Sequence, residues 1–72
     1  MENKSILVTF GEKLRQLRRE KGLTQEAFAD LCGLDRTYIS GLERGKRNPS
    51  LNAIHCMAEA LEVSAGHFFC MS

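Results

Sequence analysis

Apolar side chains recur at helical spacing along most of the chain, and glycines and capping residues divide the pattern into short segments. Phe10, Leu14 and Leu17 follow one another at i, i+4 and i+7, which places them on one face of a helix. Gly22 suits the left-handed residue that commonly ends a helix. The pattern therefore predicts a first helix over about residues 10–21.

The beginning of this first helix has two candidate signals. Thr9 and Glu12 form the capping box T-x-x-E, which predicts that the helix begins there. The apolar residues 6–8 before it fit either an earlier first turn of the same helix or an ordered arm, and both interpretations stay open.

A second helix is predicted between a capping threonine and a glycine. Thr24 is its expected N-cap, and Gly33 ends it after about two turns. Phe28 and Leu31 form its predicted buried stripe. A small residue, Ala27 or Ala29, would allow a neighbouring helix to approach closely.

A third short helix follows almost at once. Asp35 is its expected N-cap, and Gly45 closes it. Ile39 and Leu42 form its apolar i, i+3 pair, so they must face the core. The polar loop that follows ends in the only proline of the chain, Pro49.

Two more helices are predicted in the C-terminal part of the chain. Ser50 caps the fourth helix, and Ser64 caps a last short helix that carries Phe68 and Phe69. The fourth helix has an expected inward stripe of Leu51, Ile54, Met57 (or Ala58) and Leu61. No convincing period-two alternation predicts a strand, so we expect an all-α, five-helix domain that spans residues 1–72.

Composition adds two constraints. No apolar run approaches the ~20 residues that span a bilayer, and residues 1–8 are too short and polar for a secretory signal, so we expect a cytoplasmic protein without membrane contact. The net charge is only +1, but all ten Lys and Arg lie within residues 1–49 together with seven acids, whereas residues 50–72 carry two acids. This asymmetry favours one nucleic-acid face and one partner face.

The cysteines indicate neither a disulfide framework nor a metal centre. Their number is odd, which argues against disulfide pairing in a small cytosolic chain. No C-x-x-C pair exists; a zinc site would have to combine His67 and Cys70 with His55 or Cys56, two neighbours that diverge on a helix. We expect no metal and no cofactor, and leave open a redox role for Cys32, Cys56 or Cys70.

The second and third helices with the glycine turn between them form a helix-turn-helix over about residues 24–44. The second helix of such a motif enters the DNA major groove. Arg36, Thr37, Ser40 and Arg44 share the face opposite the apolar pair. We expect Arg36 and Thr37, in the first turn, to contact base edges, because arginine matches guanine and threonine offers a hydroxyl and a methyl.

Other polar side chains are expected to contact the DNA backbone, and two of them could contact either the backbone or a base. Gln25 begins the second helix, where its amide and the helix dipole can meet a phosphate. Arg44, Lys46 and Arg47 follow at the far end of the third helix. Ser40 and Tyr38 could donate to phosphate or to base, and Tyr38 fits a half-buried core flank equally well.

Three stretches, residues 22–26, 33–40 and 42–50, resemble the xenobiotic-response-element (Cro/phage-repressor-like) helix-turn-helix family. The sequence Leu-Asp-Arg-Thr-Tyr-Ile-Ser-Gly-Leu-Glu-Arg at 34–44, in so short a chain, is most similar to the controller proteins of restriction–modification systems. The resemblance implies a phage-repressor-like fold and a homodimer that binds a palindromic operator in double-stranded DNA and both activates and represses, depending on operator occupancy. We expect RNA polymerase as a further partner.

The resemblance also implies roles for single residues. In the wider family, DNA is contacted at the positions of Gln25, Arg36, Thr37, Ser40 and Arg44, and its backbone is held by the loop that matches Lys46, Arg47 and Asn48. Together with the residue types, this leads us to expect base contacts from Arg36, Thr37 and Ser40, and backbone contacts from Gln25, Tyr38, Arg44, Lys46, Arg47 and Asn48. Glu43 matches a family acid that pairs with an arginine of the first helix, and the register from Gly22 indicates Arg18 as that partner. This pair would be structural.

The dimer is expected to form through the end of the chain. Leu61, Val63, Phe68 and Phe69 are the candidate anchors, although both phenylalanines could instead close the core of a monomer. The alternative function is an antitoxin-like or adaptor module that uses the same fold without reading DNA. No nucleophile–base spacing, phosphate loop or H-E-x-x-H motif appears, so we predict no enzyme.

Overall fold

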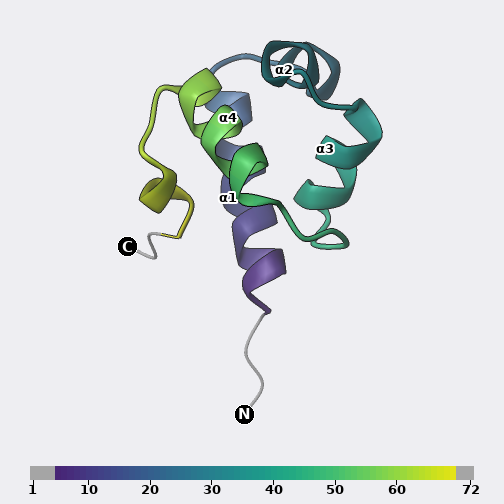
Figure 1. Ribbon diagram of the computed structural model, residues 1–72, viewed down its shortest axis with the longest axis vertical. Helices are drawn as coiled ribbons and strands as arrows, with labels where there is room; N and C mark the ends of the chain where they lie inside the picture. The colour runs from purple at the N-terminus through teal and green to yellow at the C-terminus, as the bar shows by residue number, and fades with distance from the viewer. Residues whose placement is uncertain (1–4, 70–72) are drawn as a thin grey trace.

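The computed structural model describes residues 5–69, which form four α-helices and one 3₁₀ helix. These are α1 (Ile6–Glu20), α2 (Gln25–Cys32), α3 (Arg36–Glu43), α4 (Leu51–Leu61) and η1 (Ala65–Phe69). α1 runs along the long axis, with α2 and α3 to one side and η1 to the other (Figure 1). The all-α prediction is confirmed for the described residues, none of which lies in a strand. The five-helix count is not confirmed, because the last segment is a short 3₁₀ helix rather than a fifth α-helix.

α1 begins at Ile6, four residues earlier than predicted. Its N-cap is Ser5, whose hydroxyl accepts a hydrogen bond from the Val8 amide at 3.2 Å. The prediction that Thr9 and Glu12 cap this helix is therefore wrong, and the apolar residues 6–8 form its first turn. This extra turn packs closely on the loop after α3. A Cβ atom placed on Gly45 would lie only 2.9 Å from Val8 Cγ2, so the two residues are in contact.

The N-caps of α2 and α4 follow the sequence. Thr24 and Ser50 each accept a hydrogen bond at 3.0 Å from the amide three residues on, at the starts of α2 and α4. Gly33 ends α2 with φ at 68°, as predicted. α4 ends without a glycine, because Glu62 adopts the left-handed conformation, with φ at 61°. The sequence gives no signal for this ending.

The core includes the predicted anchors of α3, since Ile39 and Leu42 are fully buried. Two other predictions of buried residues are wrong, because Leu31 of α2 and Leu51 of α4 are 62% and 84% exposed. Most of the rest of both predicted stripes is buried: Phe28, Met57, Ala58 and Leu61. Small side chains let helices pack closely, so Ala29 and Ala53 lie inward beside these residues while the two leucines stay exposed.

The end of the chain completes the core. Phe68 is 1% exposed, and its ring centroid lies 5.1 Å from that of Phe10. Phe69 is 41% exposed and stays near the edge of the same cluster, 5.8 Å from Phe10. Leu61 is also buried, at 2% exposure. Two of the four residues expected at a dimer interface are thus inside the single chain.

Cys32 and Cys56 are free and half-buried where α2 packs on α4. The Cys32 Sγ lies 4.0 Å from the Cys56 carbonyl oxygen. Burial, and to a smaller extent the neighbouring Cys56, raises the pKa of the Cys32 thiol to about 11. Cys70 lies outside the described residues. Within residues 5–69 no three His, Cys, Asp or Glu side chains come together as metal ligands, and no helix could cross a membrane.

α1 and α3 cross at a glycine. A Cβ atom on Gly11 would lie 2.7 Å from the Glu43 carbonyl oxygen and would also collide with the Leu42 carbonyl. Real Cβ atoms do not approach backbone this closely, so the crossing depends on the missing side chain.

Gly11→Ala should destabilise the protein by about 1–3 kcal/mol, although alanine favours an isolated helix by ~1 kcal/mol, because the added methyl group pushes α1 from α3. Urea denaturation followed by circular dichroism measures this change. Gly66→Ala is the matched control: its Cβ would meet open space, so the change should stay within about 0.5 kcal/mol. Equal stability of Gly11→Ala and the wild type would contradict the close crossing.

Cys32 should resist alkylation by iodoacetamide at pH 8 in the folded protein. A pKa near 11 leaves about a hundredfold less thiolate than an ordinary cysteine has, and labelling should accelerate as the pH rises toward 11. Peptide mass mapping distinguishes Cys32 from the other two cysteines, and the same reaction in urea supplies the unprotected rate. Similar rates for Cys32 in the folded and unfolded chains would refute the protection.

Candidate nucleic-acid interface

The turn between α2 and α3 is closed by backbone geometry. Gly33 is left-handed, and the Leu34 amide donates to the Ala29 carbonyl at 2.9 Å. α3 then begins at Arg36. The helix lies at the edge of the molecule (Figure 1). Because Ile39 and Leu42 fix one face of α3 in the core, the opposite face points into solvent.

The predicted base-contacting residues lie on this outward face. Arg36 and Thr37 are exposed in the first turn of α3, and Ser40 is half-buried one turn later. Arg44 is exposed and ends the helix. The structure therefore brings these four side chains to one surface without covering the two in the first turn.

A buried ion pair attaches α3 to α1. The Arg18 Nε donates to Glu43 Oε2 at 2.6 Å, and its Nη2 donates to Oε1 at 3.0 Å. The two side chains are 9% and 3% exposed. Arg18 Nη1 also donates to the Leu23 carbonyl at 2.7 Å, so one guanidinium joins α1, the turn before α2 and α3. The predicted pairing of Arg18 with Glu43 is confirmed.

Gln25 extends this ion pair toward the surface. Its Nε2 donates to Glu43 Oε1 at 3.1 Å, and its Oε1 accepts from Arg36 Nη1 at 3.5 Å. The carboxylate can only accept, so it turns the amide nitrogen inward and the amide oxygen outward. In this orientation the outward atom of Gln25 meets an arginine rather than offering a donor to a phosphate. Sequence reasoning missed this arrangement, because the three residues are distant along the chain.

Asp35 stands at the N-cap position of α3 but makes no capping hydrogen bond with its side chain. Its Oδ2 instead accepts from the Thr37 hydroxyl at 2.9 Å. The prediction that Asp35 caps the helix holds for its position and is wrong for its contact. The spacing Asp-x-Thr, two residues apart, is a local signal for such a bond that the cap assignment obscured.

The loop after α3 is fastened by Tyr38. Its hydroxyl accepts from the Ser50 amide at 3.2 Å and donates to the Asn48 carbonyl at 3.4 Å. The Arg47 guanidinium lies 5.8 Å from the centroid of the Tyr38 ring. A Cβ atom on Gly41 would lie 2.6 Å from the Arg47 Cγ, so that side chain lies across α3. Tyr38 thus braces the loop that carries Lys46, Arg47 and Asn48.

Charge is unevenly distributed around α3. Four basic side chains are exposed on α3 or the following loop: Arg36, Arg44, Lys46 and Arg47.

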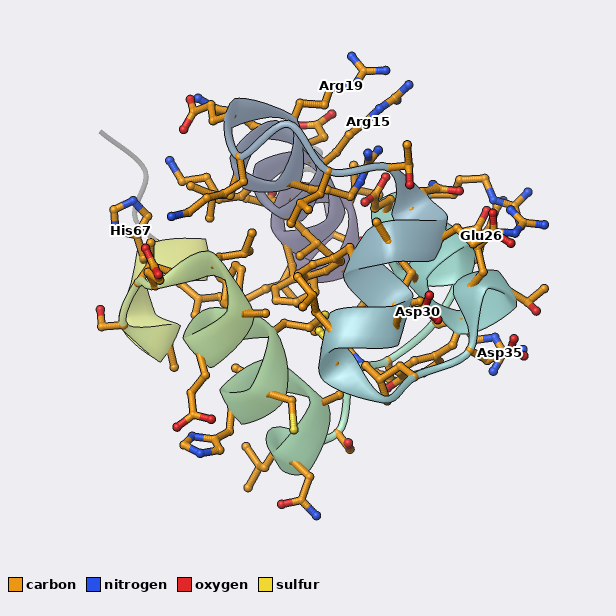
Figure 2. The ribbon with its side chains drawn as sticks, turned by 90° about the horizontal axis from the view of Figure 1, so that it is seen from above. Arg15, Arg19, Glu26, Asp30, Asp35 and His67 are labelled. Atoms are coloured by element: carbon orange, nitrogen blue, oxygen red, sulfur yellow. The ribbon has the colours of Figure 1, made fainter. Side chains whose placement is uncertain are left out.

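Carboxylates lie beside this basic surface. α2 carries the exposed Glu26 and Asp30, and Asp35 projects from the junction with α3, all on the opposite side of the molecule from His67 (Figure 2). Arg15 and Arg19 project from α1 at a separate site (Figure 2). The basic surface at α3 is therefore bounded on one side by carboxylates.

Comparison with known proteins gives a consistent result. A helix-turn-helix family model matches residues 14–68, from the middle of α1 into η1. The chain is 45% identical over 65 residues to control protein C.MunI from a Mycoplasma species, covering 89% of this chain and 88% of that protein.

Two solved structures share the fold and much of the sequence. The restriction–modification controller protein C.AhdI from Aeromonas hydrophila superposes with a TM-score of 0.88 and 50% identity, covering 92% of this chain and all of that one. The controller protein C.Esp1396I, solved as a tetramer with its natural 35 base-pair operator, has a TM-score of 0.80 and 40% identity, covering 93% of this chain and 88% of that one. The chain therefore belongs to the helix-turn-helix family and, within it, to the control proteins of restriction–modification systems.

Proposed function

We propose that the protein is a sequence-specific transcriptional regulator that binds a palindromic operator as a homodimer and both activates and represses. The observation that carries this proposal is the outward face of α3, where Arg36 and Thr37 stand exposed while Ile39 and Leu42 are fully buried beneath them. The operator complex of C.Esp1396I supports DNA as the partner.

Arg36 is the proposed contact to guanine. A guanidinium can donate two parallel hydrogen bonds to guanine O6 and N7 in the major groove. Its bond to Gln25, which Glu43 holds in turn, restricts the side chain before DNA arrives. The Arg36 side chain then loses less conformational entropy when it binds DNA, which favours affinity. Gln25 keeps a proposed place beside the DNA backbone, but its main contribution is to orient Arg36.

The remaining basic side chains are proposed to hold the phosphates. Arg44, Lys46 and Arg47 are exposed at the far end of α3, where the DNA backbone would pass. Asn48 belongs to the same loop, whose shape Tyr38 maintains through its hydroxyl. Ser40, half-buried on the same face, is the third proposed base contact.

A dimer is proposed because two recognition helices about 34 Å apart match the two half-sites of a palindrome, whose centres lie one helical turn apart. The expected anchors now divide into two groups. Leu61 and Phe68 are buried in their own chain and can add little area, whereas Val63 is half-buried and Phe69 is 41% exposed. We therefore assign the interface to the surface around Phe69.

The matching family consists of DNA-binding regulators rather than enzymes. We propose a cytoplasmic location, where operator DNA is accessible, and RNA polymerase as a further partner when the protein activates. The antitoxin-like or adaptor alternative would not need Arg36 and Thr37 free on an exposed helix face, and both are exposed here.

Arg36→Ala should weaken binding to the operator by about tenfold to a hundredfold and relax selection at one base pair, because one base contact is lost. The operator is first selected from a random DNA pool, and affinities are then measured by fluorescence anisotropy. Lys46→Ala is the control: it should weaken binding to all sequences alike and reduce the salt slope by about one. Equal losses by Arg36→Ala on operator and random DNA would rule out direct base contact.

Phe69→Ser should raise the dimer dissociation constant about tenfold or more, because it removes an exposed aromatic anchor from the interface. Sedimentation equilibrium without DNA measures this constant. Leu31→Ser is the matched control, since it removes an exposed leucine from α2, outside the proposed interface. A wild-type mass of one chain at micromolar concentration would exclude the dimer, and equal weakening by both variants would exclude this interface.

A further inference from the structure

The first turn of α3 departs from the pattern of the other α-helices. At α1, α2 and α4 the N-cap hydroxyl of Ser5, Thr24 or Ser50 accepts from a backbone amide. At α3 the N-cap carboxylate makes no such bond and binds the Thr37 hydroxyl at 2.9 Å instead. Asp35 and Thr37 are both exposed, on the surface that Arg36 shares. Their contact therefore acts where a base edge would be read.

This contact fixes the hydrogen-bonding polarity of Thr37. A hydroxyl has one proton to donate and two lone pairs that accept. When the proton is directed to Asp35 Oδ2, the Thr37 oxygen can only accept from a ligand. An ionised carboxylate likewise only accepts. The two side chains thus form a corner that carries acceptors and no donor, next to Arg36, which carries donors and no acceptor.

We infer that Asp35 is a specificity-determining residue, which holds the Thr37 proton so that the pair selects a base with an exocyclic amino group in the major groove. This inference rests on the proposed function. Cytosine N4 and adenine N6 are the two such groups, whereas guanine and thymine present carbonyl oxygens. Adenine also presents the N7 acceptor beside its amino group, which a carboxylate repels, so cytosine is the preferred base.

The contribution of Asp35 is separable from its contribution to folding. The side chain is exposed and makes no cap bond, so its removal should leave the folded state nearly unchanged. A general charge effect is separable as well. Loss of any exposed carboxylate near DNA strengthens binding to all sequences alike, whereas loss of the Thr37 constraint changes the ratio between bases at one position.

The experiment compares wild type, Asp35→Ala, Thr37→Val and Thr37→Ser on operators that differ at single base pairs. The wild type should prefer cytosine at one position by about tenfold over guanine or thymine, with adenine intermediate. Asp35→Ala should reduce that ratio to about twofold or less, because it frees the hydroxyl proton and removes the carboxylate acceptor. Thr37→Val should also reduce the ratio, but to a smaller extent, because the Asp35 carboxylate remains. Thr37→Ser keeps the hydroxyl, so this variant should retain the preference for cytosine of about tenfold.

Glu26→Ala is the matched charge control, since it removes an exposed carboxylate from α2. It should change all affinities by one common factor, and thermal melting should show all variants folded. Preference of the wild type for guanine or thymine at the position that Thr37→Val alters would overturn the inference. So would an unchanged ratio in Asp35→Ala. In both cases the proposed function would still stand if Arg36→Ala reduced base selectivity at another base pair. If no DNA sequence were selected at all, both the inference and the proposed function would be wrong.

Discussion

The buried ion pair between Arg18 and Glu43 is the interaction on which the DNA-binding face depends. Two charges that are 9% and 3% exposed are costly to remove from water, and here their two hydrogen bonds and the bond to the Leu23 carbonyl compensate for that cost. Loss of one partner would strand the other charge, at about 3–5 kcal/mol. Buried side-chain polar atoms within residues 5–69 all have partners. The pair therefore sets the position of α3 on α1 rather than adding general stability.

The same carboxylate connects the core to the surface. Glu43 accepts from Gln25, and Gln25 accepts from Arg36, so the order imposed by a buried charge reaches an exposed side chain of the first turn. A two-turn helix with Ile39 and Leu42 as its fully buried anchors has little packing of its own to fix its orientation. The polar contacts help to fix the orientation of α3, and the absence of a side chain at Gly11 allows α1 and α3 to approach this closely.

Alternation of donors and acceptors along the exposed face follows from this construction. Arg36 presents donors and Asp35 presents acceptors by their own chemistry, whereas Thr37 presents an acceptor because its hydroxyl proton is directed to Asp35. At the other end Tyr38 performs a similar task for the loop, through two hydrogen bonds to backbone atoms of residues 48 and 50. The surface that would meet DNA is thus shaped before any ligand binds.

The sequence by itself determined the helix-turn-helix and most of its boundaries. Thr24, Gly33 and Ser50 act through bonds to residues no more than four positions away, so local spacing suffices to identify them. Ile39 and Leu42 follow from periodicity, since a two-turn helix has only one apolar face. The pair of Arg18 and Glu43 was reached through a family resemblance, because nothing local links residues 25 positions apart.

Only the tertiary structure decided how these helices are rotated and which polar atoms meet. Leu31 and Leu51 fit the predicted apolar stripes, yet both are exposed to solvent. The neighbouring Ala29 and Ala53 are buried at the helix contacts instead. α1 begins at Ile6 rather than at the capping box of Thr9, and its first turn lies close to Gly45, which the sequence could not indicate. The amide orientation of Gln25 and the burial of Phe68 depend on partners from other helices. Periodicity specifies that a helix has an apolar face, but the crossing of helices decides which side chains that face buries.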